Sequence, residues 1–337
     1  MRLLSRAAAA IAAVTLLAAC GSSGTPGTGA SGSGAQSGSA PTTSLTLGLV
    51  QGQDFTFAMP ARVAEAQGIF TRHGLNVKVV AFSAGSDLVK ALASGSIDVG
   101  HATGLDVTSA AANGVDTRAF YGSAEATPMG LIATANSPMT SFADMKGKKI
   151  GISKFGSLTD YYVKLTAQSA GLSSGDVTEV PLGTPAGNLA ALQRGDVDGV
   201  MLPVTFAFTL QSKGGGKLVE RVSDVVKESQ YAVLMASSKW LQNQTAAKAL
   251  AASFAESIQW MKDNKQGTVH LAMSRLGMTN DVAGKTYDAL VPDFTPDGTI
   301  NLAGLAAFAQ ALPGLKLAPS TPAQDTYYTG AFIPVTG

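Results

Sequence analysis

The polar side chains that could bind a small molecule come directly after short apolar segments of the chain. Asp54 follows one such segment, and Ser157 and Thr159 follow another. Ser157 lies three residues before Asp160, which is the spacing of a capping box at a helix start. Free N–H groups at a helix start attract anions, whereas a carboxylate such as Asp54 attracts an ammonium or a ring N–H. The sequence therefore predicts non-covalent binding of a small solute and leaves its charge open, since Asp160 adds negative charge at the same helix end.

Other candidate ligand contacts occupy the same kind of position. Phe55 and Phe57 could form an aromatic wall, although an aromatic pair in a loop more often packs internally. His101 could contact a ligand, although a histidine at a strand end more often forms a hydrogen bond within the protein. The candidate ligand-binding residues are Gln53, Asp54, Phe55, Phe57, Ser83, Ser86, His101, Thr103, Ser123, Gly156, Ser157, Thr159, Thr205 and Tyr231.

These candidates must be positioned by alternating strands and helices. Short apolar runs alternate with helical patterns, which predicts mostly parallel sheets with helices on both faces. Ligands of such sheets bind outside the carboxyl ends of the strands, where the candidates lie. The predicted strands are 45–50, 77–82, 97–100, 118–121, 149–153, 177–180 and 199–202, and the predicted helices are 62–67, 88–94, 161–170 and 189–194.

An internal repeat divides the chain into two similar lobes. Residues 91–98 (ALASGSID) align with residues 191–198 (ALQRGDVD), one hundred residues later. Each copy has the pattern of a helix end, a glycine beyond it, and an aspartate that leads into a strand. A second pair of similar segments, at 74–77 and 171–177, precedes the two copies in the same order. A repeated α/β lobe accounts for this order better than chance similarity does.

The repeat predicts a two-lobed fold with a ligand cleft between the lobes. We expect residues 44–128 to form the first part of lobe I, 129–235 to form lobe II, and 236–337 to return to lobe I as a mainly helical segment. Two apolar runs, 129–134 and 231–236, are interpreted as the crossovers between the lobes. We therefore expect hinges near 126–130 and 234–238.

Composition and motifs argue against several classes of protein. The chain of 337 residues has 24 basic and 23 acidic side chains and no basic run, which disfavours nucleic acid as a partner. Its single cysteine excludes an internal disulfide, and three scattered histidines disfavour a metal site. No GxSxG or Walker A motif is present, and no GxGxxG follows a predicted strand. We expect no enzymatic activity, no cofactor and no metal.

The N-terminus has the pattern of an exported lipoprotein. Arg2 and Arg6 precede an apolar run at 7–19, which is typical of a signal peptide at 1–19. The run ends in Leu-Ala-Ala-Cys-Gly at 17–21, which resembles a bacterial lipobox, in which Cys20 is lipidated; a free cysteine after an ordinary signal is the alternative. Residues 21–43 are Gly, Ser, Thr, Ala, Pro and one Gln, which predicts that 20–43 is a lipidated cysteine with a flexible linker. We expect anchoring to the outer face of the cell membrane, in the periplasm or at the cell surface.

Three further segments carry a family resemblance. Residues 64–70 (AEAQGIF), 73–77 (HGLNV) and 142–152 (FADMKGKKIGI) resemble nitrate/sulfonate/taurine-binding proteins and thiamine-pyrimidine-precursor binders. The resemblance covers roughly 44–335. It implies a periplasmic-binding-protein type 2 fold and a solute-binding subunit of an ABC importer.

The resemblance also implies partners and two classes of ligand. It implies a monomer that closes on its ligand and delivers it to a membrane permease, whose ATPase is a separate chain. The first ligand class is a small organic anion such as a sulfonate, nitrate or taurine, and the alternative is a heteroaromatic such as a thiamine pyrimidine precursor. One branch of the wider family makes that pyrimidine and depends on a cysteine-rich segment, but this chain has no cysteine after Cys20. A less favoured alternative is a non-transport surface protein or an enzyme of the same fold.

Overall fold

A computed structural model describes residues 42–173 and 175–335. The predicted signal peptide, Cys20 and nearly all of the predicted linker lie outside the described residues. Within those residues, no helix is both long enough and apolar enough to cross a membrane.

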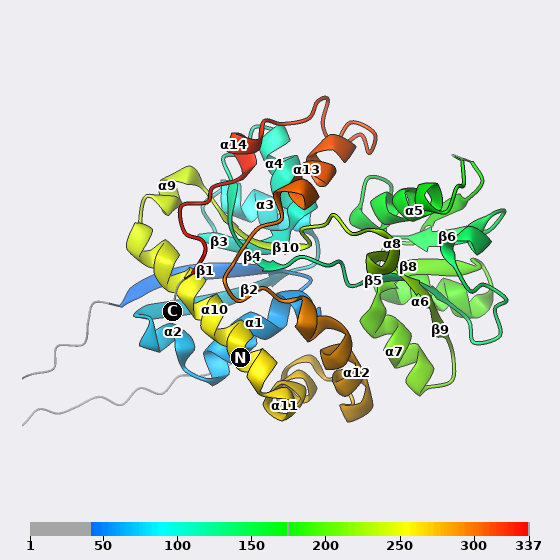
Figure 1. Cartoon of the computed structure of the whole chain (residues 1–337), viewed down its shortest axis with the longest axis horizontal. Helices are drawn as coiled ribbons and strands as arrows, with labels where there is room; N and C mark the ends of the chain where they lie inside the picture. Colours follow the sequence, from blue (N-terminus) through cyan, green and yellow to red (C-terminus); the bar gives the residue numbers. More distant parts are fainter. Residues whose placement is uncertain (1–41, 174, 336–337) are drawn as a thin grey trace, which may run out of the picture. The chain divides into compact units, whose positions relative to one another are not determined.

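Two five-stranded sheets with the same strand order form the centre of the fold (Figure 1). The fourth strand of each sheet, β10 or β5, runs antiparallel to both of its neighbours, so the other four strands of each sheet point in one direction. This confirms the expected α/β fold with two mostly parallel sheets. The first sheet has the order β2 (Leu75–Phe82), β1 (Thr43–Val50), β3 (Val99–Thr103), β10 (Ala232–Ala236) and β4 (Arg118–Ala124), and the second has the order β7 (Thr178–Pro181), β6 (Lys149–Ile152), β8 (Gly199–Pro203), β5 (Met129–Ala133) and β9 (Lys217–Arg221).

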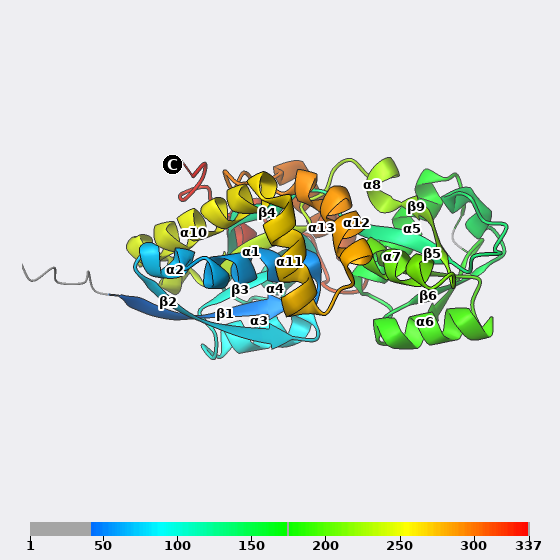
Figure 2. The same cartoon turned by 90° about the horizontal axis from the view of Figure 1, so that it is seen from below.

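Helices cover both faces of the first sheet, with α3 on one side and α1 and α10 on the other (Figure 2). The long α10 carries Leu250, Phe254 and Ile258 on one stripe, and all three are buried. The helices are α1 (Phe55–Ala66), α2 (Ile69–Arg72), α3 (Gly85–Ala93), α4 (Gly104–Ala112), α5 (Leu158–Ser169), α6 (Pro185–Arg194), α7 (Val204–Ser212), α8 (Val222–Val225), α9 (Ser238–Leu241), α10 (Gln244–Asp263), α11 (Lys265–Leu276), α12 (Asn280–Leu290), α13 (Leu302–Ala311) and α14 (Gln324–Tyr327), with short 3-10 helices η1 (Phe142–Met145) and η2 (Val291–Asp293).

The two copies of the sequence repeat adopt the same local structure. Gly95 and Gly195 both follow a helix with a left-handed backbone, at φ 72° and 78°, where a Cβ would be strained. Asp98 accepts a hydrogen bond from the Thr46 backbone at 2.7 Å, and Asp198 accepts one from the Lys149 backbone at 2.8 Å. Each aspartate thus fixes the start of β3 or β8 against β1 or β6.

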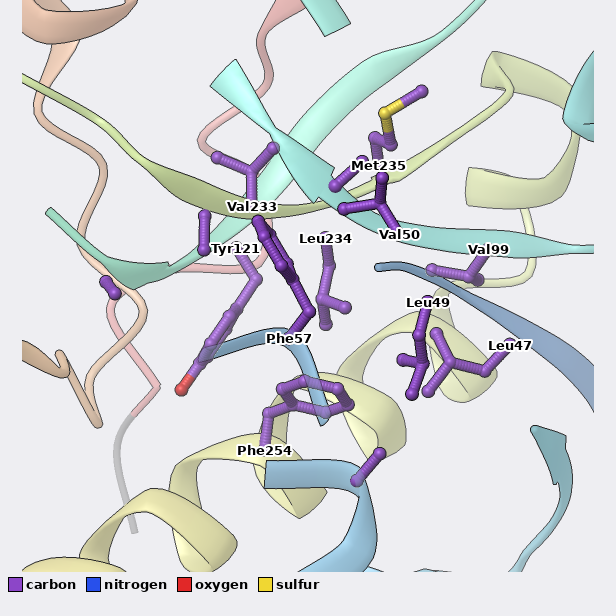
Figure 3. Packing of buried hydrophobic residues seen from close by; sticks show 14 of the residues in the cluster. Leu47, Leu49, Val50, Phe57, Val99, Tyr121, Val233, Leu234, Met235 and Phe254 are labelled. Carbon is purple, nitrogen blue, oxygen red and sulfur yellow. The ribbon is translucent and has the colours of Figure 1, made fainter. Parts of the chain in front are cut away.

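The core of the first sheet is apolar and closely packed (Figure 3). Leu47 and Leu49 of β1, Phe57 of α1 and Phe254 of α10 all have no solvent exposure. Figure 3 shows Phe57 extending between the sheet and α10. Burial of such side chains contributes about 1.5–3 kcal/mol each, so this layer holds α1 firmly in place.

The predicted crossovers are wrong in position. Met129–Ala133 and Ala232–Ala236 are β5 and β10, strands within the second and first sheets, and every residue of both is buried. Apolar segments of this length are what a strand covered on both faces requires. The connecting segments lie before them, at 125–128 and 226–231. A hinge at 234–238 would therefore cut into β10, and the expected end of lobe II at 235 falls inside the first sheet.

Candidate ligand site

Four of the helices that begin beyond the carboxyl ends of parallel strands carry the side chains considered below. Helices α1 and α4 follow β1 and β3 of the first sheet, and α5 and α7 follow β6 and β8 of the second. These ends are where α/β sheets bind ligands, because loops there are free to vary and helix N–H groups point outward. The side chains at these helix starts define the candidate site.

Asp54 is the N-cap of α1. Its Oδ1 atom accepts a hydrogen bond from the Thr56 backbone N–H at 2.8 Å. Burial raises the pKa of this carboxyl from 3.8 to about 6, against the backbone hydrogen bonds of Thr56 and Phe57, which lower it. Because this pKa lies close to neutral pH, a cation placed beside Asp54 would stabilise its ionised form.

Helix α4 begins with a reciprocal cap. Thr103 Oγ1 accepts from the Asp106 N–H at 3.0 Å, and Asp106 Oδ2 accepts from the Thr103 N–H at 3.0 Å. Burial raises the pKa of Asp106, and the hydrogen bonds from Thr103 and the charge of Lys154 partly offset this. A Cβ on Gly85 would collide with the Asp106 carboxyl. Asp106 is therefore fixed in place, with Lys154 of the second lobe near it.

The α5 start uses its own hydroxyls internally. Ser157 caps the helix and donates to the Lys154 carbonyl at 2.6 Å. Thr159 Oγ1 lies 2.8 Å from Ser157 Oγ and accepts from the Ser153 N–H at 2.9 Å. Asp160 Oδ2 accepts from the Gly156 N–H at 2.7 Å. An anion at this helix start would therefore compete with Asp160.

A cluster of buried hydroxyls lies where the connecting segments meet α5. The Tyr162 hydroxyl lies near those of Thr127 and Ser229, which belong to the segments 125–128 and 226–231. All three side chains are buried, and within the described residues none of these hydroxyls forms a well-aligned hydrogen bond. We name Thr127, Tyr162 and Ser229 the hydroxyl cluster. Leaving such groups unpaired costs about 1–3 kcal/mol each, so the cluster is suited to a polar ligand group or a bound water.

Tyr231 links the first-lobe carboxylates to this cluster. It is 1% exposed, and burial raises its pKa well above 10, with smaller effects from Asp54, Tyr162 and Asp106. These three side chains come from α1, α5 and α4. The structure thus brings together residues from both lobes around one buried tyrosine.

Four of the sequence candidates, Phe55, Phe57, His101 and Ser123, lie in the core instead of in loops. Phe55 and Phe57 are the first and third residues of α1 and have no exposure. His101 is also fully buried, with Nδ1 2.9 Å from the Phe57 carbonyl oxygen and Nε2 2.7 Å from Ser123 Oγ. Burial lowers the pKa of His101 to about 4, so the ring is neutral at pH 7. In this structure these side chains contact other parts of the protein. Internal packing of the aromatic pair and an internal hydrogen bond of the histidine were the alternatives to ligand contact that the sequence left open.

The other candidates differ in exposure. Gln53, Ser83 and Ser86 are exposed, Gly156 has φ 75° in the α5 loop, and Thr205 is 8% exposed in the first turn of α7. Four further residues at this site were not among the sequence candidates: Asp106, Thr127, Tyr162 and Ser229. The spacing of Thr103 and Asp106 is a capping-box signal that could have pointed to Asp106. The hydroxyl cluster has no local signal.

Among the described residues, no group of three or more His, Cys, Asp or Glu side chains could hold a metal.

Comparison with known proteins gives a consistent family assignment. The sequence profile described as "NMT1/THI5 like" matches residues 56–268. The "Taurine-binding periplasmic protein" of Escherichia coli is 32% identical over 165 residues, which are 47% of this chain and 49% of that protein. A "Putative aliphatic sulfonates-binding protein" of E. coli is 26% identical over 215 residues, or 63% and 66% of the two chains. The chain thus spans about half of the first relative and just under two thirds of the second.

One relative is an enzyme. The "4-amino-5-hydroxymethyl-2-methylpyrimidine phosphate synthase" of Schizosaccharomyces pombe is 29% identical over 147 residues, or 42% and 40% of the two chains.

Solved structures show the same fold. The periplasmic aliphatic sulphonate binding protein SsuA from E. coli superimposes with a TM-score of 0.72 at 23% identity, over 84% of this chain and 91% of that one. The alkanesulfonate-binding protein SsuA from Xanthomonas axonopodis pv. citri, bound to MOPS, gives 0.73 at 19% identity, over 87% and 100%. At these identities the likeness concerns the fold alone.

Proposed function

Because the chain belongs to the NMT1/THI5-like family, we propose that it is the solute-binding subunit of an ABC importer. It captures a small organic solute between its lobes, closes on it, and delivers it to a membrane permease with a separate ATPase. Closure follows from contacts that the ligand makes with both lobes at once. We further propose that the mature protein is exported, anchored through lipidated Cys20, monomeric, and not an enzyme.

The observation that supports binding at this place is the hydroxyl cluster beside Tyr231. Three buried hydroxyls that lack well-aligned hydrogen bonds within the described residues, near Asp54 and Asp106, form an environment that a polar solute would satisfy. Small-molecule sites commonly combine aromatic walls with a few convergent polar groups of this kind. Tyr162 and Tyr231 would supply the aromatic surface.

We propose an organic sulfonate as the first ligand class, on the basis of the taurine-binding and sulfonates-binding relatives. Lys154, near Asp106, is the cation that would face an anionic group. An aminosulfonate such as taurine also carries an ammonium, which Asp54 or Asp106 would pair with. A zwitterion therefore fits the mixed charges of the site better than a simple anion does.

The alternative ligand is a heteroaromatic with ring N–H groups. The raised pKa of Asp54 favours it, since a carboxyl near its titration point can pair with a protonated ring nitrogen. Stacking on a tyrosine would add to this pairing. The pyrimidine phosphate synthase among the relatives is consistent with this class, although this chain has no cysteine after Cys20.

Native mass spectrometry of protein purified without refolding tests the proposal. A bound small molecule retained from the cell, with a mass that identifies a sulfonate or a heteroaromatic, is the expected result. Calorimetric titration with taurine, an alkanesulfonate and an aminopyrimidine then measures the affinity for each class. A protein that retains no ligand and binds none of these compounds would contradict the ligand classes proposed here.

A further inference from the structure

In the first two turns of α5, the ammonium group of Lys164 contacts two carboxyl groups, those of Asp160 and Glu179. Asp160 is 1% exposed, and its Oδ1 atom lies 2.7 Å from Lys164 Nζ. Glu179 of β7 is 15% exposed, and its Oε2 atom lies 3.9 Å from the same Nζ. One positive charge therefore faces two carboxyl groups, which cannot both be ionised there without a penalty.

Each carboxyl group keeps one buried oxygen without a well-aligned hydrogen bond. Within the described residues, Asp160 Oδ1 and Glu179 Oε1 are buried and lack a well-aligned donor. The other Asp160 oxygen accepts from the Gly156 N–H at 2.7 Å and from Lys164 Nζ at 2.8 Å. A single proton held between these two oxygens would give both a hydrogen bond, since a protonated carboxyl donates and a carboxylate accepts.

We propose that Glu179 and Asp160 share one proton at neutral pH, and that this proton holds the loop 153–157 of the ligand site in place. Burial and the side-chain hydrogen bond with Asp160 raise the pKa of Glu179 to about 7, with Asp160 charge adding to the effect and Lys164 opposing it. Asp160 and Lys164 of α5 are the charged groups that act on Glu179. Its partner on the adjacent strand β6 is the uncharged Ile150.

The proton acts on the ligand site through Gly156. Asp160 holds the Gly156 N–H, and Gly156 has a left-handed backbone, at φ 75°. A Cβ at Gly156 would lie 3.1 Å from the Leu315 carbonyl oxygen, so the loop abuts the segment that follows α13. Loss of the proton places a second negative charge beside Asp160 and favours its movement toward Lys164, away from Gly156. The loop and its contact with the segment after α13 would then loosen as the pH rises.

The sign of the stability effect follows from the raised pKa. The unfolded chain loses the Glu179 proton near pH 4.5, and the folded protein loses it near pH 7. The contribution of this group to stability is therefore full below pH 4.5 and is lost as the pH rises through 7. Glu179→Gln keeps the shape, supplies an N–H donor to Asp160 and cannot titrate.

Thermal unfolding across pH 5 to 9 tests the shared proton without any ligand. Between pH 5 and pH 9, the melting temperature of the wild type should fall by about 4–8 °C more than that of Glu179→Gln. Glu65→Gln, which removes one negative charge at an exposed position, is the matched control and should follow the wild type. Parallel curves for the wild type and Glu179→Gln would overturn the proposal, as would a wild-type infrared spectrum with no protonated-carboxyl band that titrates near pH 7. Measured in Asp54→Asn, which removes the carboxyl group whose pKa is about 6, the infrared band decides the matter even where Glu179→Gln does not fold.

The effect on the ligand site rests on the proposed function and has its own measurement. With taurine or an alkanesulfonate as the probe, affinity should fall about threefold to tenfold from pH 6 to 8.5 in the wild type, and less in Glu179→Gln. Equal pH profiles would overturn the coupling to the loop, while the shared proton is judged by stability and infrared spectra alone. If no probe binds at any pH, the proposed ligand class fails and the shared proton is unaffected.

Discussion

His101 Nε2 lies 2.7 Å from Ser123 Oγ in the core of the first lobe, and neither side chain is exposed. The Phe57 carbonyl can only accept a hydrogen bond, so His101 Nδ1 carries the proton and Nε2 accepts from the Ser123 hydroxyl. This neutral tautomer holds α1, β3 and β4 together. Both residues are predicted from the sequence to contact the ligand. Their pairing with each other allows this prediction to be tested directly.

Ser123→Ala should destabilise the protein by about 1–3 kcal/mol, because it leaves a buried imidazole nitrogen without a donor. Urea unfolding at pH 7.5 measures this loss. Calorimetry with the ligand should show an affinity within about threefold of the wild type, if the pair acts only in packing. A tenfold loss of affinity with unchanged stability would instead place Ser123 in contact with the ligand.

Acid should destabilise the protein through His101. Its folded pKa, about 4, is below the ordinary value of 6.5, so the unfolded chain takes up the proton first. This contribution is full above pH 6.5 and is lost as the pH falls toward 4. His101→Gln should lack this part of the pH profile, whereas the exposed His270→Gln should keep it. Identical profiles for all three proteins would contradict a buried neutral His101.

Asp54→Asn should retain the helix cap, because asparagine caps a helix as well as aspartate does. The folded pKa of Asp54, about 6, lies above its ordinary 3.8, so its ionisation costs stability as the pH rises from 3.8 to 6. The variant should therefore be more stable at pH 7 by about 1–2 kcal/mol.

The same variant separates the ligand classes. It should leave the affinity for a simple anion unchanged or slightly increased, and it should weaken a ligand with an ammonium or ring N–H by tenfold or more. Titration with an alkanesulfonate and with taurine makes the comparison within one experiment. If the affinities for both probes change equally, Asp54 does not contact the ligand.

Tyr162→Phe should stabilise or leave unchanged the unliganded protein, because it deletes a buried hydroxyl that lacks a well-aligned partner. If the ligand or a bridging water pairs with the hydroxyl cluster, affinity should fall about fivefold to thirtyfold. Tyr161→Phe, on the neighbouring residue of α5, is the control and should bind normally. Normal affinity in Tyr162→Phe would place the ligand elsewhere.

Cys20→Ser should abolish lipid attachment and normal processing of the N-terminus, because the thiol is the group that would carry the lipid. Metabolic labelling with a fatty acid, followed by isolation of the protein, measures the attachment. A wild-type protein that takes up no label would contradict the predicted anchor.

Local sequence patterns determined most of the architecture. The seven predicted strands each lie within, or overlap, a strand of the structure, and the repeat at 91–98 and 191–198 has the same capping glycine and the same aspartate bond in both lobes. Such features are local, because strand alternation, a left-handed glycine and a helix cap depend on neighbours a few residues away. The family assignment followed from the order of the same local motifs.

Tertiary structure decided the features that join distant parts of the chain. An apolar run such as 129–134 or 231–236 has the same sequence pattern whether it is a crossover or an interior strand. Only the pairing of strands shows that β5 and β10 lie inside the sheets. The hydroxyl cluster joins Thr127, Tyr162 and Ser229, and the shared proton joins Asp160 to Glu179. A side chain's partners, and therefore its pKa and its burial, depend on long-range packing, which the local pattern of residues does not determine.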